Sequence, residues 1–412
     1  MDSYLSINFS ELDRPSVPFK DPKEIGSFSL DINSAFENSR KSLKYFVRPS
    51  NPKNVRFDLR RGFDTRIIKE KGNDINVLHW INANIDKFPI NPDEATTRQC
   101  EGASGQVSSK DATKHQGRQQ EDDQECTDQQ LEDLETELRG MKINKSGESL
   151  RANPRKLGVD FVCRRGLLTK VMLSPYEDKE GWFIAVVNYN GTYYINEILT
   201  EERKRREAEV KNDEMSCWGW KFEQYLTADT KDGQPNTDVP YNNCEKLYTV
   251  VKTELNKHSL VYSGEIDALN IDEANGDYYM EFKTTKEFAH QGHIKTFKRF
   301  KTKKWWAQSH LIGIKTIVCG FRDESGVVKR LEFYDTKSLP DFARDVYIPW
   351  KPNVCTNFLD KFLTFIKDSI RIDDPKIVHT LKWSPDTRIV CSQPLKNSEY
   401  NFLPQWYIDG SA

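Results

Sequence analysis

Residues 263–285 read SGEIDALNIDEANGDYYMEFKTT and hold two stretches in which charged and apolar residues alternate. These stretches are EID at 265–267 and EFK at 281–283, and a turn-forming segment separates them. Because side chains two apart on a β-strand point to the same face, the charged residues of each stretch share one face. The pattern predicts a β-hairpin with strands near residues 260–270 and 278–285.

A symmetric turn centred near Ala274 sets the register of this hairpin and places Asp267 opposite Glu281. The same register places Glu265 opposite Lys283. The apolar residues expected on the inward face are Ile266, Ala268, Met280 and Phe282. Such alternation is typical of an ordinary half-buried hairpin, but facing acids are unfavourable on a bare sheet surface. A divalent cation such as Mg²⁺ or Mn²⁺ would turn that repulsion into attraction, because hard cations prefer carboxylate oxygens.

The order of these charged residues favours the metal-binding interpretation of the hairpin. An acid on one strand followed by acid-x-Lys on the next is typical of PD-(D/E)xK-type metal nucleases. Hydrolysis of a phosphodiester or pyrophosphate needs an activated water and stabilisation of phosphoryl charge, and two ions that share a carboxylate supply both. The ammonium group of Lys283 would orient the water and offset charge on the phosphate.

Composition and charge limit the classes of protein to which the chain can belong. Aromatic residues make up 11% of the 412 residues, enough to support a folded core. The net charge of −2 means that a nucleic-acid partner would need a local basic groove. The eight cysteines are scattered singly, which excludes a Cys-rich zinc site, and no apolar run reaches membrane-span length. We expect an intracellular protein with no membrane partner, and the sequence leaves nuclear and cytoplasmic residence open.

The chain divides into three segments by composition. Residues 1–95 are predicted to form the N-terminal part of a catalytic domain whose main part is 156–412. Residues 96–155 are rich in Gln, Asp, Glu and Ser and are expected to be a disordered insertion, with a short helix at 128–141.

Local patterns predict paired strands and helices around the opening hairpin. Further hairpins are expected at 182–197, around Asn190-Gly191, and at 316–336, and the run at 75–85 is expected to be a short strand. Helices are expected at 201–212, 217–226, 246–257, 295–313 and 357–370. This order predicts an α+β fold of mixed β-sheets with helices packed outside, around a PD-(D/E)xK-nuclease-like metal core.

Three further blocks carry a specific family resemblance. GWKFEQY contains Glu223, KWWAQSHLIG contains Gln308, and CRRGLLTKVM contains Arg165. Together with SGEIDAL and YYMEFKTT, in this order, they closely resemble the DXO family of eukaryotic RNA 5′-end decapping enzymes, which includes the Rai-type proteins. The resemblance is strong over about 157–340, looser towards both ends, and does not extend to 96–155.

The resemblance implies a set of metal ligands. Asp267 and Glu281 would be the central ligands of two divalent ions, Mg²⁺ or Mn²⁺. Glu265 and Glu223 would complete the coordination directly or through water, together with the backbone carbonyl of Phe282.

It also implies which residues contact the substrate. Glu223, Lys283 and Gln308 would take part in catalysis and in substrate binding, with Lys283 and Gln308 at the scissile phosphate or the attacking water. Arg165 would bind RNA phosphates, although Arg164 is also basic where many family members have an aromatic residue.

The activity implied is removal of incomplete or NAD-type caps on the RNA side of the cap phosphates, which releases the whole cap nucleotide. Pyrophosphate removal from 5′-triphosphate RNA and 5′→3′ exoribonuclease activity in the same pocket are left open. The rival hypotheses are a non-catalytic partner that stabilises a 5′→3′ exoribonuclease of the Xrn or Rat type, and a DNA nuclease that shares only the metal core.

Several other residues receive structural expectations. Trp305 and Trp306 are expected in the core or in a groove wall. The basic run 298–304 is either a solvated helix face or a basic rim for an RNA 5′ end. The histidines expected to be structural or exposed are His290, His293 and His310.

Overall fold

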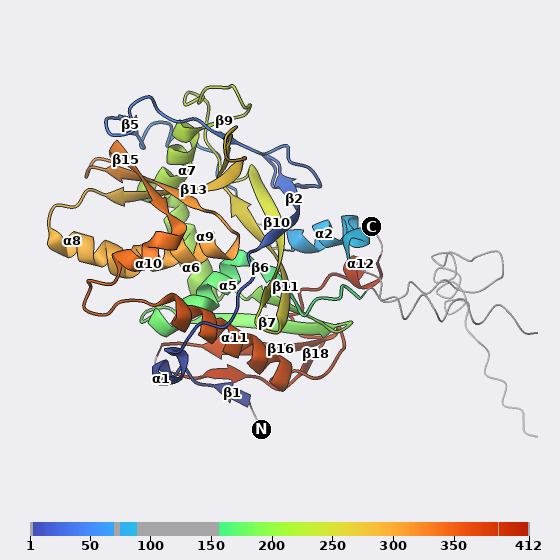
Figure 1. The fold of residues 1–412 in the computed structure, drawn as a ribbon. Helices are drawn as coiled ribbons and strands as arrows, with labels where there is room; N and C mark the ends of the chain where they lie inside the picture. The colour runs from blue at the N-terminus through green and yellow to red at the C-terminus, as the bar shows by residue number, and fades with distance from the viewer. Residues whose placement is uncertain (1–2, 70–74, 89–155, 386, 411–412) are drawn as a thin grey trace, which may run out of the picture.

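The computed structural model describes residues 3–69, 75–88, 156–385 and 387–410, and their strands form two mixed β-sheets with helices outside (Figure 1). This arrangement confirms the α+β prediction. In spatial order, the first sheet comprises β1 (Ser3–Leu5), β17 (Ile389–Cys391), β16 (Ile377–Trp383), β7 (Trp182–Tyr189), β8 (Thr192–Glu197), β6 (Phe161–Arg164), β11 (His258–Ile266), β10 (Lys246–Leu255), β2 (Lys23–Leu30) and β3 (Phe36–Glu37), with β18 (Leu395–Lys396) paired to β16. The second comprises β5 (Phe57–Asp58), β15 (Val327–Asp335), β14 (Thr316–Arg322), β13 (Tyr278–Lys286), β12 (Ala268–Asn270), β4 (Tyr45–Phe46) and β9 (Thr227–Ala228).

Helices pack against the faces of both sheets. The α-helices are α1 (Phe9–Leu12), α2 (Asn76–Ala83), α5 (Arg165–Leu173), α6 (Glu201–Asn212), α7 (Glu214–Leu226), α8 (Gln291–Thr296), α9 (Thr302–Leu311), α10 (Leu339–Phe342), α11 (Pro352–Ser369) and α12 (Gln405–Ile408). A π-helical segment, η3 (Phe297–Lys301), joins α8 to α9, and the short 3₁₀ turns are η1 (Ile85–Lys87), η2 (Ser174–Tyr176) and η4 (Thr336–Ser338). Among the described residues, no helix is both long and apolar enough to cross a membrane.

The described residues before position 89 and those after position 155 contribute strands to both sheets. Strands β1, β2 and β3 of the N-terminal part join the first sheet, and β4 and β5 join the second. The insertion expected at 96–155, with its helix at 128–141, lies outside the described residues.

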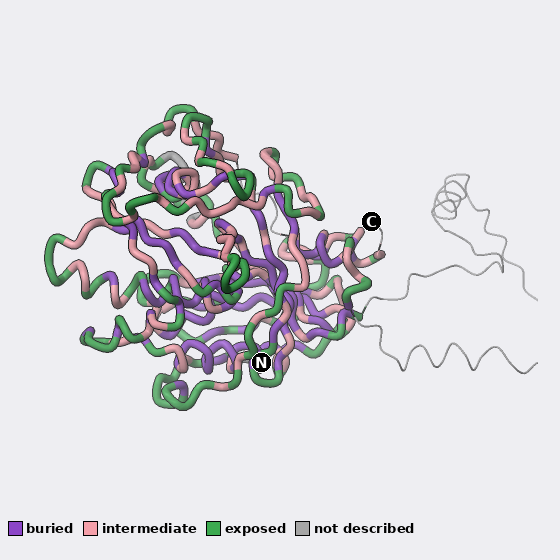
Figure 2. Tube along the Cα trace, turned by 45° about the horizontal axis from the view of Figure 1, so that its top comes forward, coloured by how far each residue is buried: buried purple, intermediate pink, exposed green. Residues whose placement is uncertain are grey.

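The core follows from strict alternation along the strands. Ile184 and Val186 of β7 pack into one cluster with α5 and α11, whereas Ala185 and Val187 pack into another with α2. The first sheet is therefore buried on both faces, and Figure 2 shows its central strands inside a shell of exposed loops. A third cluster lies between the second sheet and α7.

The opening hairpin is only partly confirmed, because the chain changes sheets within it. Strands β12 and β13 pair as expected, with Ala268 opposite Met280. Strand β11, however, ends at Ile266 and belongs to the first sheet, where Glu265 pairs with Tyr248 of β10. The expected pairing of Glu265 with Lys283 is therefore wrong, and the two sheets meet at the residue between β11 and β12.

Two predicted elements have the wrong type. Residues 246–257, expected to be helical, form β10 and the turn into β11, and β10 pairs with β2 on one side and β11 on the other. Residues 75–85, expected to be a strand, contain α2. Val77, Leu78, Trp80 and Ile81 are its buried residues, at helical rather than alternating spacing.

The other hairpins and helices are confirmed. Strands β7 and β8 turn at Asn190 and Gly191, both with positive φ, as a two-residue Asn-Gly turn requires. Strands β14 and β15 form the hairpin expected at 316–336, and α6, α7, α9 and α11 occupy the remaining predicted helical ranges.

Candidate active site

Four carboxylates meet where the chain passes from the first sheet to the second. Glu265 lies near the end of β11, Asp267 is the single residue between β11 and β12, and Glu281 lies on β13. The backbone N–H of Phe282 donates a 2.6 Å hydrogen bond to Oδ2 of Asp267. Since the N–H and C=O of a strand residue point to the same side, the carbonyl of Phe282 also faces this side of β13. The crossing therefore gathers acids that lie on different strands.

Helix α7 brings the fourth acid, Glu223, to the crossing. The helix begins at Glu214, and the side chain of Asp213 caps it by accepting a 3.1 Å hydrogen bond from Ser216 N. Its apolar face packs on the second sheet, where a Cβ atom at Gly320 of β14 would lie 2.5 Å from Cε2 of Phe222. The glycine therefore permits the close approach that sets Glu223 beside the strands.

Crowding of negative charge perturbs the acids of this cluster. Burial raises the pKa of Glu223 to about 7, and the charges of Glu265 and Glu281 add to the rise while Lys246 opposes it. Burial, and then the charges of Glu281 and Glu223, raise the pKa of Asp267 well above its usual value. A group of acids in which some side chains retain protons is typical of a functional site that accepts a cation.

Two lysines pair with the other acids. Lys283 forms an ion pair with Glu281, and Lys246 of β10 forms one with Glu265. Burial would lower the pKa of Lys246, but the charges of Glu265 and Glu223 raise it above its usual value, so this side chain keeps its positive charge. Lys246 was not singled out by the sequence, because the PD-(D/E)xK pattern contains no lysine at this place.

Arg165 and Gln308 complete the set of predicted site residues. Arg165, the first residue of α5, places Nη1 at 3.6 Å from Oε2 of Glu281 and donates a 3.2 Å hydrogen bond to the backbone carbonyl of Gln308. The Oε1 atom of Gln308 is buried without a hydrogen-bond partner. The structure thus brings all the predicted residues to the sheet crossing or directly beside it.

The donor atoms of the cluster fit a hard divalent cation. Among the described residues, no group of three or more His, Cys, Asp or Glu side chains is arranged as a metal site. Lys246 and Lys283 are paired with two of the acids in this arrangement. The chemistry nevertheless suits a cation, because all donors are oxygens and Oε2 of buried Glu281 has no hydrogen-bond partner. The residues that could hold metal are Glu223, Glu265, Asp267, Glu281 and the carbonyl of Phe282.

Two cavities flank the acids. The Arg165 cavity, of about 520 Å³, is lined by basic and aromatic residues that include Lys69, His79, Arg164, Arg165 and Tyr248. The Glu223 cavity, of about 470 Å³, is lined by Glu223, Asp267, Lys41, Lys44 and several amide side chains. Trp220, Lys246 and Glu265 line both cavities. The sequence did not single out Trp220, because its position between the two cavities depends on tertiary structure.

The basic run 298–304 does not form a continuous rim. Lys298 pairs with Asp345 at 2.6 Å, Lys301 donates to Thr285 Oγ1 at 3.1 Å, and Lys303 donates to the carbonyl of Tyr176 at 2.5 Å. Burial, and then the charges of Lys283 and Arg203, lower the pKa of Lys304.

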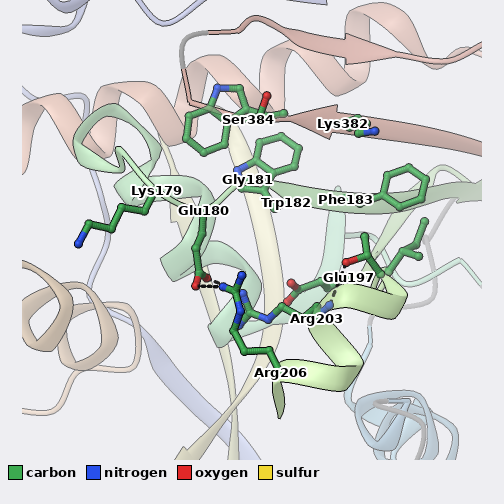
Figure 3. Close-up of a pocket in the computed structure, with 13 residues that line it drawn as sticks. Lys179, Glu180, Gly181, Trp182, Phe183, Glu197, Arg203, Arg206, Lys382 and Ser384 are labelled. Carbon is green, nitrogen blue, oxygen red and sulfur yellow. Dashed lines mark hydrogen bonds and ion pairs between the residues drawn. The ribbon is translucent and has the colours of Figure 1, made fainter. Parts of the chain in front are cut away.

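A separate cavity of about 250 Å³ lies beside Arg203 (Figure 3). There Glu180 points towards Arg203 and Arg206 and accepts hydrogen bonds of 2.8 and 2.6 Å from them. Its arginines are therefore paired with an acid rather than directed at the acid cluster.

The aromatic and histidine expectations near α9 are confirmed. Trp305 and Trp306 are both buried, and His310 stacks on Trp306 with ring centroids 4.8 Å apart. His290 accepts a hydrogen bond from Gly292 N and His293 one from Ala289 N, which are structural contacts.

The sequence profile of RAI1-like PD-(D/E)XK nucleases matches residues 20–101 and 111–408. Within the expected insertion, only 102–110 fall outside this match. The chain is 32% identical over 401 residues to the decapping and exoribonuclease protein of Xenopus laevis, covering 96% of this chain and 87% of that protein. It is 30% identical over 405 residues to the protein of the same name from Homo sapiens, covering 95% and 85%.

Solved structures with the same fold are also found. Rai1 of Scheffersomyces stipitis in complex with 3′-NADP⁺ and a calcium ion has a TM-score of 0.71 at 21% identity, covering 100% of this chain and 97% of that chain. Rai1 of Candida albicans in complex with pU5 and Mn²⁺ has a TM-score of 0.72 at 17% identity, covering 100% and 99%. At these identities the likeness shows the fold.

Proposed function

The chain belongs to the family of RAI1-like PD-(D/E)XK nucleases, and from this premise we propose that it is a metal-dependent hydrolase of RNA 5′ ends. Its substrates are RNAs with incomplete or NAD-type caps, and the whole cap nucleotide is released. Pyrophosphate removal from 5′-triphosphate RNA belongs to the same proposal. The observation that carries it is the meeting of four acids and Lys283 at the sheet crossing, with a cavity on each side.

The relatives support this class of substrate. Curated relatives that match over most of their length are named for decapping and exoribonuclease activity. Solved Rai1 structures hold 3′-NADP⁺, 3′-FADP or pU5. A cleft that accepts a dinucleotide and an RNA 5′ end in turn suits an enzyme that cuts between a cap nucleotide and RNA.

The proposed cofactor is a pair of divalent ions, Mg²⁺ or Mn²⁺. Asp267 and Glu281 are the proposed central ligands, with Glu265, Glu223 and the carbonyl of Phe282 around them. Such ions activate water and neutralise charge on the phosphoryl oxygens. Calcium and manganese in the solved Rai1 structures support a site for hard divalent cations.

The remaining site residues act on the substrate. Lys283, which pairs with Glu281, is proposed to orient the attacking water and to offset negative charge at the scissile phosphate. Arg165 lines the basic cavity and is the proposed anchor for RNA phosphates, because a guanidinium binds two phosphate oxygens at once. Gln308, whose Oε1 has no protein partner, is the proposed neutral contact to the water or the phosphate.

The completeness of the acid set favours an enzyme over the role of a non-catalytic partner. A protein that only stabilises an exoribonuclease of the Xrn or Rat type does not need a cluster of four acids in which burial raises the pKa of Glu223 and Asp267. Capture of such an exoribonuclease in a pull-down, without metal-dependent turnover by the isolated chain, would support that rival. Cleavage of DNA as fast as RNA of the same sequence would support a DNA nuclease.

The direct test is incubation of the full chain with Mn²⁺ and RNAs that carry an NAD cap, an unmethylated cap, a 5′-triphosphate or a 5′-monophosphate. Mass spectrometry then identifies the released nucleotide. The proposal expects intact cap nucleotide from capped RNA, and release of mononucleotides from monophosphate RNA would add exoribonuclease activity. Absence of any released cap or pyrophosphate would refute the proposal.

A further inference from the structure

We propose that Lys246 is an exchangeable cation: it pairs with Glu265 in the metal-free protein and binds the phosphates of the leaving cap nucleotide once Glu265 has taken a metal ion. The PD-(D/E)xK pattern gives Lys246 no role, and this inference rests on the proposed function.

The position of Lys246 follows from the strand register. Leu247 of β10 pairs with Ile266 of β11, so Lys246 extends the ladder opposite Asp267, where β11 leaves the first sheet. From there its ammonium reaches Glu265 and forms a direct ion pair. The side chains of Lys246 and Glu265 are only 20% and 29% exposed, so this pair is partly shielded from solvent.

Metal and lysine compete for one carboxylate. A divalent ion bound by Glu265 would take the oxygen that now accepts the ammonium, and the two positive charges would repel each other at contact distance. The flexible four-carbon stem of lysine allows the ammonium to move away while its backbone stays in β10. Binding of a metal ion by Glu265 would thus free the ammonium group of Lys246, which lines both cavities.

The cavity linings indicate where the released ammonium acts. Lys246 lines both cavities, beside the place where the scissile linkage must lie. Of the three described lysines that line the Glu223 cavity, Lys41 pairs with Glu37 and Lys44 pairs with Asp229. Lys246 is thus the lysine of this cavity whose acid partner is itself a proposed metal ligand. If Arg165 holds the RNA side, the leaving nucleotide occupies the Glu223 cavity, and its phosphates meet Lys246.

Calorimetric titration of the metal-free full chain with Mn²⁺ tests the exchange. Lys246→Met removes the competing cation, and we expect Mn²⁺ to bind about tenfold tighter, the fold-change that corresponds to one charged hydrogen bond. Lys170→Met is the matched control, because Lys170 forms a similarly buried pair with Glu197, which is not a proposed ligand. It should leave Mn²⁺ affinity unchanged. Unchanged or weaker Mn²⁺ binding by Lys246→Met would overturn the proposal.

Steady-state kinetics test the second half. With saturating Mn²⁺, Lys246→Met should raise KM for NAD-capped and 5′-triphosphate RNA about tenfold. The inhibition constant of 5′-monophosphate RNA of the same sequence, which lacks the leaving phosphates, should change less than about twofold. Lys246→Arg keeps the charge and should keep KM near the wild-type value, which provides a second variant if Lys246→Met does not fold. Equal effects on all three RNAs would refute the assignment to the leaving phosphates.

The two proposals fail in different ways. Wild-type protein that neither binds Mn²⁺ nor hydrolyses capped RNA contradicts the proposed function. Active wild-type protein whose Lys246→Met variant has unchanged Mn²⁺ affinity and unchanged KM contradicts only the role of Lys246.

Discussion

Asp267 and Phe282 are joined across the two strands by a 2.6 Å hydrogen bond from the backbone N–H of Phe282 to Oδ2 of Asp267. The bond lies just beyond the pairing of Ala268 with Met280, although Asp267 itself belongs to neither sheet. It fixes the carboxylate against the strand that carries Glu281 and Lys283. The fold and the proposed chemistry therefore depend on the same side chain.

Arg165→Ala should lower kcat/KM for capped RNA by about ten- to a hundredfold, because it removes the proposed charge-assisted contact to RNA phosphate. Arg165 is 9% exposed and ion-paired with Glu281. Arg164→Ala is the matched comparison: Arg164 is less buried than Arg165, so we expect a smaller loss. A larger loss in Arg164→Ala than in Arg165→Ala would show that Arg164, and not Arg165, contacts the phosphate.

Gly320→Ala should destabilise the protein by roughly 1–3 kcal/mol through overpacking. The new methyl group would lie 2.5 Å from the ring of Phe222 and force α7, with Glu223, away from the sheet. Thermal unfolding measures the loss. The control is Gly219→Ala on the exposed face of α7, where a Cβ meets nothing within 4 Å and should stabilise the helix by about 0.5–1 kcal/mol.

Glu223→Gln should stabilise the metal-free protein at alkaline pH. The pKa of Glu223 is raised to about 7 in the fold from the usual 4.5, so its stabilising contribution is present below 4.5 and lost as pH rises through 7. The variant resembles the protonated acid, and we expect it to exceed wild type by roughly 1–3 kcal/mol above pH 7 and to match it in acid. Chemical denaturation at both pH values measures the difference. Equal stability of the two proteins across this range would contradict the raised pKa.

The sequence predicted the parts of this site that depend on local pattern. Alternation in the EID and EFK stretches was enough to pair β12 with β13 and to bury Met280 and Phe282. It could not show that Glu265 pairs with Tyr248 in another sheet, because that partner is chosen by tertiary contacts. The same reason explains why β10 was expected to be a helix: its ten residues are held by β2 and β11, which lie on either side of it. Lys246 became visible as a site residue only after this strand was placed.

The position of Glu223 relative to the hairpin could not be predicted from the sequence. Its block suggested a helix and the family resemblance suggested its role, but its distance from the hairpin depends on Gly320 and Phe222, which are far apart in sequence. The Arg165 and Glu223 cavities depend in the same way on loops and helices that meet only in the folded chain. Spacing rules describe single elements, whereas cavities arise between elements.

His310→Phe should flatten the stability of the protein between about pH 6.5 and 4. Burial lowers the pKa of His310 from 6.5 to about 4, so the unfolded chain takes up a proton in this range and the folded protein does not. Stability should therefore fall as pH falls from 6.5 towards 4, by up to roughly 2–3 kcal/mol. Phenylalanine keeps the stack on Trp306 without the proton. An identical decline in the variant would show that other groups cause it.

The central claim is that Asp267 holds the metal on which hydrolysis depends, and paired Asp→Asn variants of one hairpin test it most directly. Asp267→Asn keeps the size of the side chain and removes the charge. Asp272→Asn makes the same change in the turn, where the Asp272 carboxylate accepts hydrogen bonds from Ala274 and Asn275 of its own loop. The measurement is release of NAD from NAD-capped RNA with Mn²⁺, beside calorimetric Mn²⁺ binding, on folded samples of both. We predict loss of both Mn²⁺ binding and turnover, by at least about a hundredfold, in Asp267→Asn, with Asp272→Asn unchanged. Wild-type turnover by folded Asp267→Asn protein would contradict the account.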